Sequence, residues 1–198
     1  MKRVIHFTRR RGLLGAGMFM LVGAHVAVDV LAHETFGPVR PPLPAPAMKL
    51  TATHGKAFEL SRALHNRVTA VQLMFTGCSA TCPIQGAVFA DVQQRLDGEA
   101  LDFRLLSISI DPLGDDLDAM RAWLAKFGAQ PYRWSGALPS PADVDRLLDF
   151  MRGRASGADR HTPQTYIFDR RARLAFRSAD LPSGEQLVSL MKQVASLA

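Results

Sequence analysis

Cysteine is scarce in this chain, with only two residues among 198. So few thiols exclude a small scaffold held together by a framework of disulfides. The chain also lacks internal repeats and lacks a basic segment interleaved with aromatic residues, so we expect no nucleic-acid partner. The net charge of +6 does not alter this, because residues 1–32 hold five Lys/Arg and one Asp. The remainder is nearly balanced, with 19 basic and 17 acidic residues.

The two cysteines lie close together, as Cys78-Ser-Ala-Thr-Cys82, and Pro83 follows them. The apolar run at 68–75 predicts a buried strand before the pair, and residues 84–96 predict a helix after it. A proline near the first helical position costs no hydrogen bond. We therefore expect both sulfurs on a strand-to-helix turn, where the helix dipole favours the thiolate. Thiolates serve disulfide exchange and also bind soft ions such as Cu(I), whereas two inert buried cysteines are the alternative.

The N-terminal residues have the order of an export signal. Basic residues up to Arg11 precede a mostly apolar stretch at 12–28 and then small residues before His33. We expect residues 1–32 to be an export signal or an N-terminal membrane anchor, and the protein to lie in the periplasm or on the outer face of the inner membrane. Residues 33–49 are expected to be a proline-rich linker, because closely spaced prolines favour an extended spacer.

Strands alternate with helices in the remaining domain, residues 50–198. This order predicts an α/β fold with a central mixed sheet and helices on both faces. Strands are predicted at 58–60, 68–75, 103–110, 164–168 and 174–177. Helices are predicted at 84–96, from Asp115 or Asp116 to about 127, and at 140–151. A last helix is predicted after Ser183, which forms a capping box with Gln186. The cysteines then lie at the carboxyl edge of the sheet, where open α/β sheets place their sites.

Two sulfurs form a clamp for a soft metal that a third ligand would secure. His161 is the best candidate, because it falls just before the predicted strand at 164–168, and an edge strand beside the first core strand would bring it over the cysteines. His54 and His65 are expected to be solvated residues in the segment that leads into the first core strand. His33 is a further ligand candidate if cleavage leaves it at a new amino terminus.

Three motifs resemble the Sco/SenC family of copper-binding, thioredoxin-like proteins. They are Cys78-Ser-Ala-Thr-Cys82-Pro83, Ser107-Ile-Ser-Ile-Asp111-Pro112, and His161-Thr-x-x-Thr165-Tyr166-Ile167-x-Asp169, and the resemblance covers residues 55–198. It implies a thioredoxin-like fold and the copper ligands Cys78, Cys82 and His161. It also implies a copper-receiving partner, such as a cytochrome c oxidase subunit. Asp111 is expected to be a turn residue rather than a direct ligand.

Two functions follow from this resemblance and from the thiol pair. The first is a copper metallochaperone that holds one copper ion, as Cu(I) and also as Cu(II), and delivers it to the partner or prepares the partner's thiols. The alternative is an extracytoplasmic thiol–disulfide oxidoreductase, in which Cys78 attacks and Cys82 resolves the mixed disulfide. A peroxidase is disfavoured, because Phe75 stands where a peroxiredoxin carries threonine.

Two features depart from the family pattern. Residues 79–81 lack the acidic residue that the family often has between its cysteines, a change expected to weaken Cu(II) binding more than Cu(I) binding. Pro163 stands where thioredoxins carry a cis-proline, which favours the redox function. A copper carrier is therefore expected to have a trans Thr162–Pro163 bond, since X–Pro bonds adopt either isomer at little cost.

Overall fold

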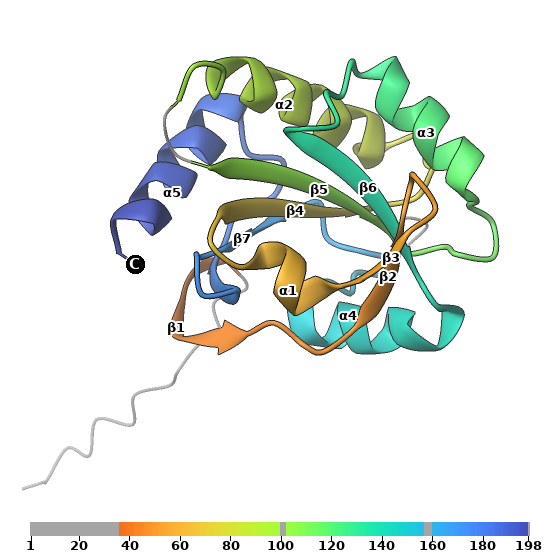
Figure 1. The fold of residues 1–198 in the computed structure, drawn as a ribbon, viewed down its shortest axis with the longest axis horizontal. Coiled ribbons are helices and arrows are strands. Elements are labelled where there is room, and N and C mark those ends of the chain that lie inside the picture. Colours follow the sequence, from red (N-terminus) through yellow and green to blue (C-terminus); the bar gives the residue numbers. More distant parts are fainter. Residues whose placement is uncertain (1–35, 100–101, 157–159, 198) are drawn as a thin grey trace, which may run out of the picture. The chain divides into compact units, whose positions relative to one another are not determined.

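A single eight-stranded sheet organises the computed structural model, which describes residues 36–99, 102–156 and 160–197. The strand order is β1-β8-β7-β4-β5-β6-β2-β3 (Figure 1). The strands are β1 (Gly37–Pro44), β2 (Lys49–Ala52), β3 (Ala57–Glu59), β4 (Val68–Met74), β5 (Phe103–Ser109), β6 (Trp134–Pro139), β7 (Thr165–Phe168) and β8 (Arg173–Arg177). Strands β4, β5 and β6 are parallel and the other pairs are antiparallel. The predicted mixed sheet is confirmed.

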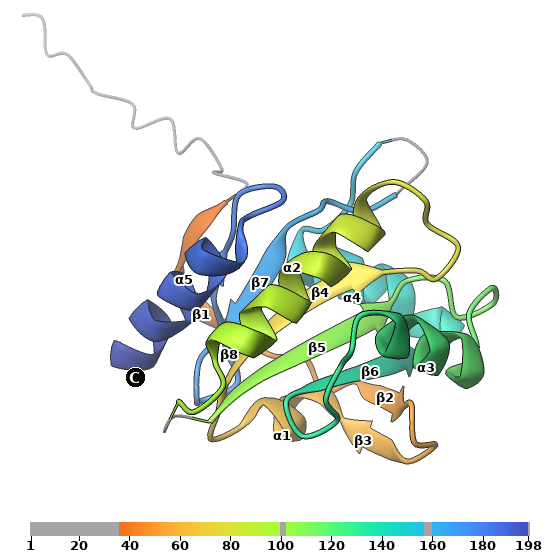
Figure 2. The same ribbon diagram turned by 90° about the horizontal axis from the view of Figure 1, so that it is seen from above.

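Helices cover both faces of this sheet. Helices α2, α3 and α5 lie over one face, and α1 and α4 lie over the other (Figures 1 and 2). The helices are α1 (Leu60–Leu64), α2 (Thr81–Arg95), α3 (Leu117–Lys126), α4 (Val144–Met151) and α5 (Gly184–Ser196). A short 3-10 helix, η1 (Pro141–Asp143), precedes α4. Two separate hydrophobic clusters result, one on each face of the sheet.

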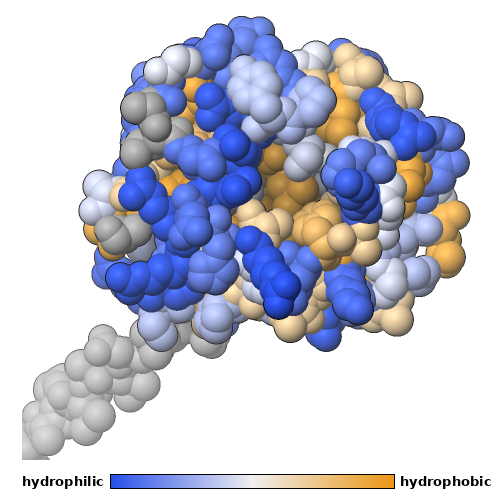
Figure 3. Space-filling view, viewed as in Figure 1, coloured by the Kyte–Doolittle hydropathy of each residue, from blue (hydrophilic) through white to orange (hydrophobic). Residues whose placement is uncertain are grey.

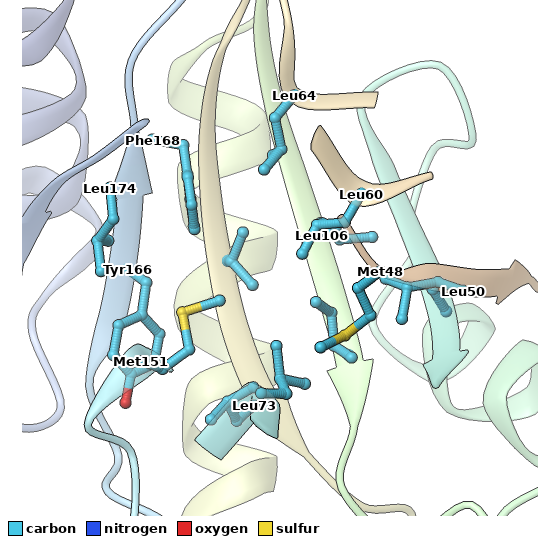
Figure 4. Packing of buried hydrophobic residues seen from close by; sticks show 14 of the residues in the cluster. Met48, Leu50, Leu60, Leu64, Leu73, Leu106, Met151, Tyr166, Phe168 and Leu174 are labelled. Atoms are coloured by element: carbon cyan, nitrogen blue, oxygen red, sulfur yellow. The ribbon is translucent and has the colours of Figure 1, made fainter. Parts of the chain in front are cut away.

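Strand β4 is the centre of the domain. All seven of its residues are buried, because β5 and β7 flank it and helices lie over both of its faces. Figure 4 shows the cluster on the α4 face, where Leu73 of β4 lies near Met151 of α4 and Tyr166 of β7. The two clusters hold β4 in place and thereby fix the start of the loop that follows it.

Helix starts follow the predicted capping signals. The Ser183 hydroxyl accepts from the Gln186 amide, and the Gln186 side chain accepts in return from the Ser183 amide, which forms the predicted capping box. Asp116 rather than Asp115 caps α3, since its carboxylate accepts from the Ala119 amide. Helix α2 begins at Thr81, three residues earlier than predicted, and so takes Cys82 into its first turn.

The prediction of a proline-rich linker at 33–49 is wrong for the residues that the structure describes. Residues 37–44 form the edge strand β1, which pairs antiparallel with β8. An edge position tolerates proline, because a residue without an N–H can face solvent there. Val39 and Met48 are buried in the core, so the folded domain begins near residue 37 rather than at 50.

The sequence predicts only a loop or short strand at 131–134, whereas the structure has the strand β6 at Trp134–Pro139. The small residues Ser135, Gly136 and Ala137 have weak strand propensity, but pairing with β5 on one side and β2 on the other holds them extended. The predicted export segment at 1–32 lies outside the described residues. Within the described ranges, no helix has the length and apolar character needed to cross a membrane.

Candidate metal centre

The cysteines lie where β4 passes into α2. Cys78 is in the connecting loop, and Cys82 is in the first turn of the helix. Both are thiols rather than a disulfide. The Cys82 backbone amide donates to Cys78 Sγ over 3.4 Å. The first turn of α2 therefore directs a backbone N–H at the Cys78 sulfur.

A buried carboxylate anchors the start of the cysteine loop. Asp115 accepts from the Thr76 amide at 3.1 and 3.2 Å, from the Thr76 hydroxyl at 2.5 Å, and from the Ser109 hydroxyl at 2.6 Å. It therefore ties the residue two positions before Cys78 to the end of β5. Hydrogen bonds to a charged acceptor are among the stronger ones, so this junction is held firmly.

The pairing of β7 with β4 places His161. These strands are antiparallel, with Gln72 opposite Thr165, so the segment that leads into β7 lies at the end of β4 from which the cysteine loop begins. The histidine is 1% exposed, and its Nε2 lies 3.7 Å from Cys82 Sγ. The structure thus brings together Cys82 and His161, which are 79 residues apart in sequence.

The His161 ring is oriented by two neighbours. Its Nδ1 lies 3.0 Å from the Thr162 carbonyl oxygen, which only accepts, so Nδ1 carries a proton, and in the neutral ring Nε2 presents a lone pair toward Cys82. The Phe75 ring packs edge-on against the imidazole, at 6.2 Å between centroids and 85° between planes. A neutral imidazole with one nitrogen bonded to a carbonyl is the usual state of a metal-ligating histidine.

The segment around His161 is closed by tight contacts. The Thr162 amide donates to the Gly153 carbonyl, and the Thr162 hydroxyl bonds to the buried Tyr166 hydroxyl at 2.8 Å. A Cβ at Gly153 would lie 2.8 Å from both Leu73 Cδ1 and Tyr166 Oη, so only glycine fits there without displacing its neighbours. Burial of Tyr166 raises its pKa to about 12, although its bond to Thr162 acts in the opposite direction.

The other candidate residues lie elsewhere. His65 is exposed and precedes β4, at the opposite end of that strand from the cysteines, and His54 is exposed in the β2–β3 turn. His33 is outside the described residues. Asp111 forms a turn, as expected: its carbonyl accepts from the amides of Gly114 and Asp115, and its carboxylate lies 3.9 Å from Arg160.

The Thr162–Pro163 bond is trans, which is the isomer expected for a copper carrier. Among the described residues, the cis peptide bond is Arg40–Pro41. Among the described residues, no three His, Cys, Asp or Glu side chains are already grouped so as to hold a metal ion. Two donors are nevertheless close enough. Thiolate–metal and imidazole–metal bonds are about 2.3 and 2.0 Å long, so one ion reaches both Cys82 Sγ and His161 Nε2 across 3.7 Å.

The fold and the site together define a thioredoxin-like protein with a thiol pair at a helix N-terminus and a buried histidine beside it. The SCO1/SenC family model matches residues 43–195. The chain therefore belongs to the SCO1/SenC family.

Comparison with known proteins agrees with this assignment. A SCO1 protein homolog of Bacillus subtilis (strain 168) is 30% identical over 71 residues, which is 36% of this chain and 37% of that protein. The match thus spans little more than a third of that relative's length.

Solved structures of Sco proteins share the fold. A SCO1/SenC family lipoprotein from Bacillus anthracis is 23% identical, with a TM-score of 0.69 over 80% of this chain and 97% of that one. BsSco, a member of the Sco family of cytochrome c oxidase assembly proteins in which a disulfide switch has been identified, is 19% identical, with a TM-score of 0.69 over 80% and 96%. Copper-bound ScoI of Bradyrhizobium japonicum is 23% identical, with a TM-score of 0.64 over 77% and 99%.

Asp115 is the site residue that sequence reasoning missed, since it was weighed only as a helix cap. The signal was present in the consecutive pair Asp115-Asp116, because only one of two adjacent acids caps a given helix. The other acid is then available for another contact, and Asp115 is buried against Thr76 and Ser109.

Replacing Asp115 by Asn tests this anchor. The amide nitrogen of asparagine cannot accept from Thr76 or Ser109, so we expect a loss of about 1–3 kcal/mol in the free energy of unfolding, measured by urea denaturation of the reduced full chain. The matched control is Asp116→Asn, which should change stability by only a few tenths of a kcal/mol, because Asn and Asp cap helices about equally well. Equal losses for the two variants would refute a special role for Asp115.

Tyr166 should make the fold sensitive to alkali. Because its pKa is raised from 10.0 to about 12 in the folded state, the unfolded chain loses this proton first. Stability is full below pH 10 and falls as the pH rises through 12, by about 2–3 kcal/mol in total. Tyr166→Phe should flatten the decline in unfolding free energy above pH 10, whereas Tyr132→Phe, at the exposed second tyrosine, should keep the parent slope. A parent slope in both variants would contradict this account.

Proposed function

We propose that this chain is a copper metallochaperone that holds one copper ion through Cys78, Cys82 and His161. The observation that carries the proposal is the approach of His161 Nε2 to Cys82 Sγ at a helix N-terminus. Copper-bound structures of Sco proteins from Bradyrhizobium japonicum and other organisms, which share this fold, support the choice of metal.

The donor set matches the chemistry of copper. Two thiolates select Cu(I), and the borderline imidazole extends the site to Cu(II). The Cys82 amide donates to Cys78 Sγ, and the Nδ1 contact with Thr162 leaves Nε2 as the ring nitrogen that faces Cys82. With Cys82 and His161 already near each other, a small movement of the Cys78 loop completes a three-ligand site.

The proposed receiver is a copper-binding partner such as a cytochrome c oxidase subunit. BsSco, a similar protein, belongs to a family of cytochrome c oxidase assembly proteins. Transfer would proceed by ligand exchange at the more exposed thiol, which is Cys78 at 8% against 0% for Cys82. No nucleic-acid role is proposed, because the charge beyond residue 32 is nearly balanced.

A thiol–disulfide oxidoreductase is the second candidate. The two thiols and the amide that donates to Cys78 Sγ favour it, and a disulfide switch is known for BsSco. In this reaction the Cys78 thiolate attacks a partner disulfide, and the released partner sulfur takes up a proton. The Cys82 thiolate then attacks Cys78 Sγ, which frees the second partner thiol and leaves this chain oxidised by two electrons.

Copper titration tests the ligand set. We expect the reduced full chain to bind one Cu(I) in competition with a chelator. Removing a residue that only hydrogen-bonds to a metal ligand lowers metal affinity by roughly 10–100-fold, and removing a ligand itself should lower it more. Cys78→Ala and Cys82→Ala should therefore bind Cu(I) at least about a hundredfold more weakly than the parent. His161→Ala should weaken Cu(II) most, while His65→Ala at an exposed position should match the parent. Parent-like binding by His161→Ala in both copper states would show that the third ligand is wrong, and binding by both cysteine variants would refute the site.

We further propose that residues 1–32 direct the chain out of the cytosol, as an export signal or a membrane anchor, to the periplasm or the outer face of the inner membrane. The basic-then-apolar order of that segment supports this, and a similar protein from Bacillus anthracis is a lipoprotein. Cell fractionation should find the full chain in the periplasmic or membrane fraction. Intact protein in the cytosolic fraction would contradict the proposal, and the variant Arg9→Ala/Arg10→Ala/Arg11→Ala should shift the chain toward the cytosol.

A further inference from the structure

A large pocket lies at the other end of β4 from the cysteines. It has a volume of about 650 Å³ and extends from α1 and the β2–β3 hairpin to the start of β6. Ligand pockets are commonly about 300–1,000 Å³, so this one is large enough for a small molecule. Figure 3 shows apolar residues in a recessed area on the face that carries α1, with hydrophilic residues around them. Since β4 spans seven residues, the pocket lies about 20 Å from the cysteine loop.

The wall of the pocket is largely apolar. Leu64, Leu106 and Trp134 line it and are buried, and Phe58 and Leu124 add further apolar surface. Burial of an acyl chain or ring system against such a wall is favourable, at about 25 cal/mol per Å² of apolar surface. The wall therefore suits a ligand with a sizeable hydrophobic part.

The polar lining has one sign of charge. Four arginines, Arg67, Arg104, Arg121 and Arg133, border the pocket, and none of the described residues that line it is acidic. Arg67 and Arg104 share one carboxylate, Asp102, which leaves this trio with a net positive charge. Arg133 is 7% exposed and donates to the carbonyls of Phe103 and Leu96, and no carboxylate in the described part of the chain forms an ion pair with it.

Two buried polar atoms at this end of the pocket have no hydrogen-bond partner among the described residues. They are Thr69 Oγ1, on a residue 2% exposed, and Arg67 Nε, whose nearest carboxylate oxygen is 3.7 Å away. Arg67 directly precedes β4 and Thr69 is the second residue of that strand, so both lie at the same strand end, where Thr69 pairs in register with Arg104. Buried polar groups are almost always hydrogen-bonded in folded proteins, so these atoms are poised for a ligand.

We propose that this pocket binds an anionic amphiphile, meaning a single acyl chain that carries a carboxylate or phosphate head. The head accepts hydrogen bonds from Arg67 Nε and Thr69 Oγ1 beside the Arg104 guanidinium. The chain lies along the apolar wall that Leu64, Leu106 and Phe58 form on the same face of the sheet. This site does not depend on the proposed copper function, because none of its residues belongs to the metal centre.

The test uses the reduced full chain and the fluorescent fatty acid cis-parinaric acid, with energy transfer from tryptophan as the signal. We expect one saturable site from which palmitate and lysophosphatidic acid each displace the probe. Hexadecanol, which has the same chain without a charge, should displace it at least about tenfold less well, because it lacks the charged acceptor. Inorganic phosphate, an anion without a chain, should not displace it. A difference between palmitate and lysophosphatidic acid would identify the preferred head group.

Variants distinguish probe binding in the pocket from probe binding to the apolar residues 1–32. Residues 1–32 are the same in every variant, so any difference in binding comes from the pocket. We expect two variants to bind the probe at least about fivefold more weakly, because each loses a hydrogen-bond donor to the charged head. They are Thr69→Val, which preserves side-chain volume, and Arg67→Gln. Arg62→Gln, an exposed arginine on α1 outside the pocket, should match the parent. The far-UV circular dichroism spectrum should be unchanged in all three, which shows that they fold.

Three results would overturn the proposal. The first is equal probe binding in all three variants and the parent, which would place the fatty acid elsewhere on the chain. The second is equal displacement by hexadecanol and palmitate, which would show that the arginines are not used. The third is displacement by inorganic phosphate alone, which would make the pocket a simple anion site.

Discussion

The antiparallel pairing of β4 with β7 is the constraint on which the site depends. Strand β4 ends at the cysteine loop, and β7 begins just after His161, so their register decides whether imidazole and thiol meet. A slip of one residue would turn every β7 side chain to the opposite face. The register is protected because Tyr166 and Phe168 are buried in one core cluster while Ile167 is buried in the other.

Local contacts then orient the side chains that this pairing brings together. Asp115 fixes the start of the cysteine loop, an amide in the first turn of α2 donates to Cys78 Sγ, and the Thr162 carbonyl selects the His161 tautomer. Thiolates suit both of the proposed functions, copper transfer and disulfide exchange. The arginine-lined pocket occupies the far end of β4, so a ligand there leaves the thiol end of the sheet open to a partner protein.

Sequence reasoning reached the elements with strong local signals and missed those that tertiary contacts create. Strands β4 and β5 are runs of apolar residues, and the Ser183–Gln186 capping box is a local motif, so both were predictable. Strand β1 was mistaken for a linker, because its prolines carry no strand signal and only pairing with β8 makes it a strand. His161 was predicted from the motif and the strand order, whereas the anchoring role of Asp115 depends on the spatial meeting of Thr76 and Ser109, which sequence spacing does not reveal.

The central claim is that copper is held by two sulfurs and one imidazole. X-ray absorption at the copper edge of the Cu(I)-loaded, reduced full chain measures this coordination directly. The account predicts two sulfur neighbours at about 2.3 Å and one nitrogen at about 2.0 Å, with the nitrogen lost in His161→Ala and retained in His65→Ala. A parent spectrum that shows sulfur alone, or that is unchanged in His161→Ala, would contradict it.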